Sequence, residues 1–230
     1  MNELVDFRPD MGQKLVYLAP NNKEPFTTSE VIAERAEVKH HAIQQLIQKH
    51  EADFKSFGIL AFEMRKPPEG SKGGRPVLVY HLNEQQATLL MTYLKNTEVV
   101  RKFKMDLVRQ FYAMRRELEK CNNIKVNALR PSRRKMTDAI DELPDSPHKK
   151  FKYPQFINLV YLTAIGKTAK AIRAERGAKP TDAASDFLTS DELLLVDDFT
   201  NRVGVMIDAG LDYKTIKAAL QKRLTAKEAS

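Results

Sequence analysis

The feature of this sequence that most restricts its fold is a tight junction between two short helical patterns, within TTSEVIAERAEVKHHAIQQLIQKH at residues 27–50. The apolar residues keep helical spacing, are interrupted once, and resume without an intervening glycine or proline. A helix-turn-helix needs such a junction, because its two helices cross steeply around a small residue and leave one face of the second helix free. We assign Ala33 as the small residue and Thr28 or Ser29 as the N-cap of the first helix.

The second predicted helix carries polar residues on the face that this packing leaves free. The positions expected to pack the two helices together are Ile32, Ala36, Val38, Ile43 and Leu46. The free face holds Lys39, His40, His41, Ala42, Gln44, Gln45, Gln48 and Lys49. Gln pairs in a bidentate way with adenine, and Lys reaches guanine or phosphate, so we expect this face to enter the major groove of DNA. The alternative is a plain pair of core helices with solvated polar faces.

The turn itself departs from the usual helix-turn-helix pattern at one position. Glu37 stands where such turns commonly use glycine. A glutamate is tolerated there if its backbone stays in a right-handed conformation, and an acid beside DNA phosphates is mildly unfavourable.

A basic hairpin is predicted after these helices. Residues 58–65 and 76–82 are rich in β-formers, and residues 66–74 between them form a loop crowded with Pro, Gly and Lys. A helix-turn-helix followed by such a hairpin is the element order of a winged helix. The wing is expected to bring four basic residues to the DNA backbone or minor groove, namely Arg65, Lys66, Lys72 and Arg75. Ser29, at the start of the first helix, completes the predicted set of DNA-binding residues.

The predicted fold class is mainly α with a small β component, namely an N-terminal winged helix-turn-helix and an all-α C-terminal domain. Residues 1–120 form the first domain, with a short strand at 14–19, a helix capped by Asn83 and a long helix from about Thr97 to Lys120. An apolar seam runs along that long helix, formed by Val100, Phe103, Leu107, Phe111, Met114 and Leu118. Residues 121–153 contain several prolines and predict a basic linker, in which RRKMTDAIDEL at 133–143 could form a brief helix. Residues 154–230 predict a helical domain in which TSDE at 189–192 is a capping box.

The charge distribution fits either a polyanionic partner or a solvated linker. The net charge of +8 divides into +3 for residues 1–120, +4 for 121–152 and +1 for 153–230. This suits nucleic acid without indicating a sequence preference, and RNA binding through the basic middle stretch is a further alternative. No apolar run is long enough to span a bilayer. The lone Cys121 fits a reducing cytoplasm.

Motifs that would indicate chemistry at a site are not recognised in the sequence. His40 and His41 are adjacent, so on a helix they point about 100° apart and do not chelate one metal together. We find no phosphate-binding loop, paired carboxylates or nucleophile motif. We therefore expect no catalytic activity, no metal and no cofactor.

Residues 15–116 resemble the phage regulatory proteins of the Rha family. The similarity rests on four pieces in order: LVYLAPNNKEPFTTSEVIAE, HHAI at 40–43, GRPVLVYHLN at 74–83 and LLMTYLKNTEVVRKFKMDLVRQFYAM at 89–114. The resemblance implies a DNA-binding regulator encoded by a temperate phage or prophage, with His40 at the family's usual position. Glu37, Ala42 and Gln45 depart from the family pattern, which implies that this chain reads a different DNA sequence or binds less tightly. The C-terminal segment resembles the small helical tails of phage regulators and antirepressors.

These observations lead to a primary hypothesis and a rival. The chain is expected to be a sequence-specific transcriptional regulator of double-stranded DNA in the cytoplasm of a bacterial host. It is expected to pair as a homodimer or higher oligomer, mainly through residues after Pro154, because a helical domain of about 75 residues often needs a partner to bury enough apolar surface. The rival is an antirepressor-like factor that binds a host or phage regulator protein.

Overall fold

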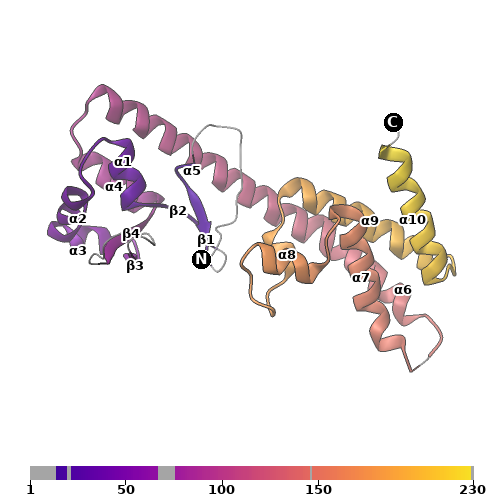
Figure 1. Cartoon of the computed structure of the whole chain (residues 1–230). Coiled ribbons are helices and arrows are strands. Elements are labelled where there is room, and N and C mark those ends of the chain that lie inside the picture. Colours follow the sequence, from indigo (N-terminus) through magenta and orange to yellow (C-terminus); the bar gives the residue numbers. More distant parts are fainter. Residues whose placement is uncertain (1–13, 20–21, 67–75, 146, 229–230) are drawn as a thin grey trace. The chain divides into compact units, whose positions relative to one another are not determined.

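The computed structural model of the chain describes residues 14–19, 22–66, 76–145 and 147–228, and its elements form two compact units that divide between Arg116 and Glu117 (Figure 1). The N-terminal unit contains β1 (Tyr17–Ala19), β2 (Asn22–Thr28), α1 (Ser29–Arg35), α2 (His40–Lys49), α3 (Glu51–Ser56), β3 (Ala61–Arg65), β4 (Val77–Asn83), α4 (Glu84–Tyr93) and the first part of α5 (Glu98–Ile124). The C-terminal unit contains the end of α5, the π-helical turn η1 (Lys125–Leu129), α6 (Arg130–Asp141), α7 (Lys149–Ile165), α8 (Ala169–Glu175), the 3-10 turn η2 (Ala184–Phe187), α9 (Ser190–Asp208) and α10 (Tyr213–Glu228). The fold is mainly α with one small antiparallel sheet, as predicted.

The sheet has the strand order β1-β2-β4-β3, so β3 and β4 form the hairpin that the sequence predicts. β2 pairs with β4 only from Phe26 to Thr28, because the chain turns into α1 at Ser29. Residues 77–80 of β4 therefore pair with β3 on one side and with no strand on the other. Both α1 and α2 contact β4. The end of β2 thus leaves backbone groups of β4 open for side chains of these helices.

Helices α1 and α2 bury the apolar residues that were predicted to hold them together. Ile32, Ala33, Ala36 and Ile43 are buried, whereas Val38 and Leu46 are half-buried. Ile47 and Phe54 are also fully buried and join the same core, although neither was predicted. Complete burial of a side chain of this size contributes roughly 1.5–3 kcal/mol, so these contacts fix the angle between the helices.

The remaining helices of the N-terminal unit complete its core. Asn83 caps α4 as predicted, and the side chain of Gln86 closes a capping box by accepting the Asn83 backbone N–H. The apolar seam of α5 faces inward, with Val100, Phe103, Leu107, Phe111 and Met114 all buried. The seam is therefore part of the core.

The C-terminal unit is built around α9, against which α6 and α7 pack. Thr189 and Glu192 form the predicted capping box at its start. Its inward face is closed by side chains that are almost completely buried, namely Leu193, Val196, Val203 and Ile207.

Residues 121–153 were expected to be a linker with a possible brief helix at 133–143, and they are largely helical, with α6 at the place of that brief helix. Pro131 follows the widened turn η1 directly, so the irregular part of the helix coincides with the residue that lacks an N–H. Met136 and Ile140 of α6 are buried against the rest of the unit. Proline signals indicated a linker, but the apolar face of α6 is the stronger determinant of the structure.

Candidate nucleic-acid interface

The turn between α1 and α2 is short and contains one strained residue. The backbone N–H of Val38 donates to the carbonyl of Ala33 at 2.9 Å, which closes the turn around the small residue. Glu37 has φ of 54°, the left-handed conformation that favours glycine. The tolerance expected for Glu37 supposed a right-handed backbone, so the structure corrects that expectation. A left-handed non-glycine residue costs roughly 1–2 kcal/mol, which the surrounding core must offset.

Ser29 joins the first helix to the second helix and to the hairpin. Its Oγ lies 2.9 Å from Nε2 of His40 and accepts the backbone N–H of Tyr80 at 3.0 Å. That N–H belongs to the part of β4 beyond the end of β2, so Ser29 satisfies a buried donor that would otherwise lack a partner. Ser29 is completely buried. The structure thus gives Ser29 a role inside the fold, which differs from the predicted contact with DNA.

Gln44 provides a second connection between α2 and β4. Its Nε2 donates to the carbonyl oxygen of Leu78 at 2.6 Å. Leu78 and Tyr80 are two residues apart on the same strand, so Ser29 and Gln44 together satisfy neighbouring backbone groups at the open side of β4. The side chain of Gln44 is therefore engaged within the protein.

The surroundings of His40 favour its neutral form over its charged form. Burial lowers the pKa of His40 below its ordinary value, while the nearby Glu30 carboxylate opposes this shift. A neutral imidazole presents no positive charge to a phosphate. We therefore assign His40 to the contact between α1 and α2 rather than to the binding of an anion.

The outer face of α2 keeps a separate set of polar side chains. Lys39, His41, Gln45, Gln48 and Lys49 are all exposed. His41, Gln45 and Gln48 are spaced by four and three residues, which places them in one row along the helix. Among the residues that the structure describes, no hydrogen bond or ion pair is found for these three side chains. Their donors and acceptors are directed to solvent.

One of the predicted cations of the hairpin is already paired within the protein. Arg65 forms ion pairs with Glu30 of α1 and with Glu63 of β3. Although burial raises the pKa of Glu63, the hydrogen bond and charge of Arg65 lower it overall, so the Glu63 carboxylate stays ionised and partly neutralises Arg65. Lys66 is exposed. Lys72 and Arg75, the other predicted wing residues, lie outside the described residues.

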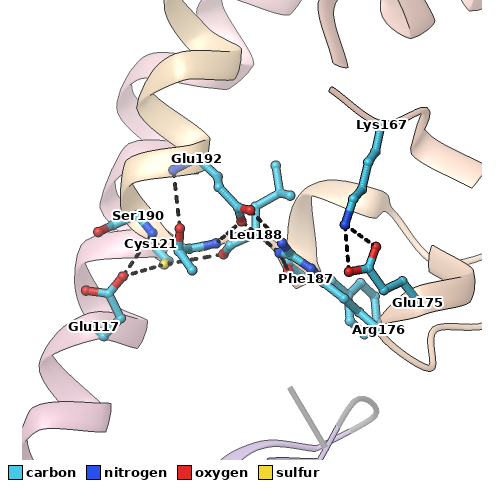
Figure 2. Close-up of polar contacts among 10 residues, drawn as sticks. Glu117, Cys121, Lys167, Glu175, Arg176, Phe187, Leu188, Ser190 and Glu192 are labelled. Atoms are coloured by element: carbon cyan, nitrogen blue, oxygen red, sulfur yellow. Dashed lines mark hydrogen bonds and ion pairs between the residues drawn. The ribbon is translucent and has the colours of Figure 1, made fainter. Parts of the chain in front are cut away.

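A second polar cluster, in the C-terminal unit, holds the chain segment that enters α9 (Figure 2). Arg176 makes a two-fold contact with the Glu192 carboxylate at 2.7 and 2.5 Å and also donates to the carbonyl of Phe187. Glu192 in turn accepts the backbone N–H of Thr189. Although burial raises the pKa of Glu192, the hydrogen bond from Arg176 lowers it overall. These contacts hold the loop that leads into α9, and we call this cluster the clamp.

The end of α5 contacts the same loop. Glu117 accepts the backbone N–H of Ser190 at 2.9 Å, and Cys121 Sγ lies 3.8 Å from both the Glu117 carboxylate and the carbonyl of Leu188 (Figure 2). Burial and the Glu117 charge raise the pKa of Cys121 to about 11. Cys121 is therefore a protonated, buried thiol at neutral pH, which suits a packing role.

The described part of the chain offers neither a metal-ligating cluster nor a membrane-spanning helix. The residues at 14–19, 22–66, 76–145 and 147–228 contain no group of three or more acidic, His or Cys side chains placed to hold a metal ion. Within the same ranges, no helix is both long enough and apolar enough to cross a bilayer.

Comparison with known proteins supports the N-terminal resemblance. Residues 27–116 match the family model described as phage regulatory protein Rha, which confirms the similarity stated above for these residues. The matched region contains α1, α2, the hairpin, α4 and most of α5. No curated protein matches the chain.

Proposed function

We propose that this chain, whose N-terminal half carries the Rha-family region, is a non-catalytic phage or prophage regulator that binds double-stranded DNA in the bacterial cytoplasm through a winged helix-turn-helix. The observation that supports this proposal is the division of polar residues on α2. Ser29, His40 and Gln44 are engaged within the fold, whereas His41, Gln45 and Gln48 are exposed in one row without an internal partner. A helix that is firmly anchored on one side and polar on the other is what groove recognition requires.

The exposed row determines the bases that we expect to be read. Gln45 and Gln48 suit adenine, because the amide NH₂ donates to N7 while the amide oxygen accepts from N6–H₂, and His41 suits the acceptors of guanine. Lys39 and Lys49 flank the row and are exposed, so we expect them to contact phosphates on either side. Lys66, together with the predicted contacts of Lys72 and Arg75, adds phosphate contacts from the wing. Arg65 contributes less, because two carboxylates already neutralise it.

Selection of bound fragments from random duplex DNA, followed by titration of the selected site over a salt series, tests the proposal. We expect a recovered motif and an affinity that falls steeply with salt, since phosphate contacts release counterions. Lys49→Ala should weaken all sequences alike and flatten the salt dependence. No binding to any duplex, or binding that is insensitive to salt, would refute the proposal.

A second candidate function is an antirepressor-like factor that binds a host or phage regulator. The acidic surroundings of the turn and hairpin favour it, because Glu30 and Glu63 beside Arg65, and the exposed Glu37, repel phosphates. Pull-down from a host lysate treated with nuclease separates the two functions. A partner that persists without nucleic acid supports this candidate, and loss of every partner with the nucleic acid eliminates it.

The proposed regulator acts as a homodimer or higher oligomer, held mainly by residues after Pro154. A single winged helix buries little surface on DNA, and pairing brings two recognition helices to half-sites about one turn of DNA apart. Light scattering should show an oligomer for the full chain and a monomer for a truncation that ends near Lys150. A full-length monomer at micromolar concentration would contradict this part of the proposal.

A further inference from the structure

The strand β3 forms one edge of the N-terminal sheet and is open to solvent along its length. Among the described residues it pairs only with β4, in a regular register from Ala61 to Arg65. All five of its residues are exposed. The outer backbone groups of an edge strand readily accept another strand, so natural proteins commonly protect such edges with a proline, a bulge or an unpaired charge. β3 contains neither a proline nor a bulge.

One face of β3 carries large apolar side chains that the fold leaves uncovered. Phe62 is 61% exposed and Met64 is 54% exposed. They lie on the same face because side chains alternate along a strand. The Phe62 ring lies edge-on to the ring of Tyr80, which is buried, with 6.5 Å between the centroids. The apolar surface of the hairpin thus continues from the core to the outer edge of the sheet, as at a surface that binds another chain.

The opposite face of β3 carries charges that already neutralise one another. Glu63 and Arg65 form an ion pair on this face, and Arg65 also pairs with Glu30 of α1. Lys66 follows the strand and is exposed. These two acids and two cations have no net charge. The edge therefore lacks the unpaired charge that would repel a second copy of the same strand.

We infer that β3 pairs antiparallel with β3 of a second copy of the chain, about a two-fold axis at Met64. Side chains that oppose each other across two antiparallel strands lie on the same face, so the axis must pass at a residue, and Phe62, Glu63 and Met64 are the central choices. An axis at Glu63 opposes two like charges, which is unfavourable. An axis at Phe62 opposes Glu63 to Ala61. Only an axis at Met64 opposes Glu63 to Arg65 of the second copy, on both sides of the axis.

This arrangement keeps the ion pair that each copy already has. Glu63 and Arg65 are neighbours along one strand, and the second copy places a cation and an acid across from them, so the four charges alternate in sign. On the other face, the two Met64 side chains oppose each other, and each Phe62 lies diagonally across from the second copy's Met64. The contact joins the two four-stranded sheets into one. It lies wholly within the N-terminal unit and is independent of the pairing proposed for residues after Pro154.

Cysteine cross-linking of the full-length chain tests both the contact and its register. Met64→Cys places two thiols opposite each other at the proposed axis, within the separation that a disulfide spans. Met105→Cys is the matched control, since Met105 of α5 is 52% exposed. The native Cys121 is buried and stays in both variants. In oxidised glutathione, we expect the Met64→Cys dimer to form at least about tenfold faster than the Met105→Cys dimer, because the paired strands raise the effective concentration of the thiols.

Charge reversal gives an independent measurement by sedimentation equilibrium. Glu63→Arg alone and Arg65→Glu alone each oppose like charges, so each should raise the dissociation constant of this contact more than about tenfold. An equal mixture of the two variants opposes an arginine to a glutamate at both positions and should restore the wild-type association. Lys102→Glu, at an exposed position of α5, should leave the association unchanged. Circular dichroism checks that each variant is folded, and the cross-linking test involves no change of charge.

The results that would overturn the inference differ from those that would refute the proposed function. Equal rates for Met64→Cys and Met105→Cys would exclude the contact. Faster cross-linking of Phe62→Cys than of Met64→Cys would exclude the axis at Met64. Absence of the Met64→Cys dimer, together with weaker binding of duplex DNA by Phe62→Ser, would assign the strand to DNA instead. A chain that cross-links through Met64→Cys but binds no duplex would refute only the proposed function.

Discussion

The two polar clusters of this protein do different work although both connect distant segments. Around Ser29, neutral groups satisfy backbone atoms of β4 that the end of β2 leaves open, and the neighbouring side of α2 stays free. Around Arg176, an ion pair clamps the loop before α9, and the polar atoms of Arg176 and Glu192 are turned toward each other. This difference shows that a polar residue can be assigned to binding only after its hydrogen-bond and ion-pair partners within the protein are known. Five experiments break or sharpen this comparison.

The largest expected effect is the loss of the clamp by Arg176→Ala. The change leaves the half-buried Glu192 carboxylate without its cation and the Phe187 carbonyl without its donor, so the C-terminal unit should lose about 3 kcal/mol of unfolding free energy. Urea unfolding followed by circular dichroism measures this. Lys167→Ala is the control, because its pair with Glu175 is exposed and contributes less than about 1 kcal/mol. Equal losses for the two variants would show that the clamp is an ordinary surface pair.

The N-terminal cluster is tested in the same way by Ser29→Ala. The buried Tyr80 N–H would lose its acceptor and His40 its neighbour, so we expect a loss of about 2 kcal/mol in the N-terminal unit. Ser56→Ala removes an exposed hydroxyl that donates to the Asp53 carbonyl, and it should change stability by less than about 0.5 kcal/mol. A Ser29→Ala protein as stable as the Ser56→Ala protein would place Tyr80 N–H in contact with water.

Gln44 and Gln45 form a matched pair within one helix. Gln44→Ala removes the bond to Leu78, so it should cost about 1 kcal/mol of stability and weaken all DNA sequences alike. Gln45→Ala should leave stability unchanged and reduce discrimination between DNA sites by about 1–3 kcal/mol, the size of one bidentate base contact. Thermal melts and competition titrations against a mismatched site measure the two effects. Loss of discrimination in the Gln44 variant alone would reverse the proposed roles.

Local signals explain which features were predicted from the sequence. The caps at Asn83 and Thr189 depend on residues three positions away, so their type and position are readable in the sequence. The bond from Gln44 joins residues 34 positions apart and depends on where β2 ends, which no local pattern reveals. Gln44 and Gln45 therefore look alike in the sequence. The helix α6 was expected only as a possible brief helix within a linker, because its proline is a strong local signal and its packing against α9 is not local.

A gain of stability is expected from Glu37→Gly. Glycine adopts the left-handed conformation without strain, but it also has more freedom in the unfolded chain, so the net gain should be about 0.5–1 kcal/mol. The change also removes an acid from the predicted DNA-facing side, and affinity for duplex DNA should rise at low salt. Glu34→Ala, an exposed neighbour on α1, controls for charge alone. No gain in stability would mean that the turn is not strained at Glu37.

The smallest expected effect is a difference between the two units in how their stability depends on pH. Burial lowers the pKa of His40 below its ordinary value of 6.5, so the unfolded chain takes up a proton first as the pH falls. The N-terminal unit should therefore lose stability as the pH falls below about 6.5 and through the lowered pKa of His40. The Arg176 hydrogen bond lowers the pKa of Glu192 from 4.5 despite the opposing effect of burial, so the C-terminal clamp should hold until the pH falls below that value. Unfolding monitored separately in each unit at pH 7.5, 5.5 and 4 tests this order, with His40→Gln removing the first step. Loss of the C-terminal unit between pH 7.5 and 5.5, or a His40→Gln protein that keeps the first step, would contradict the assignment.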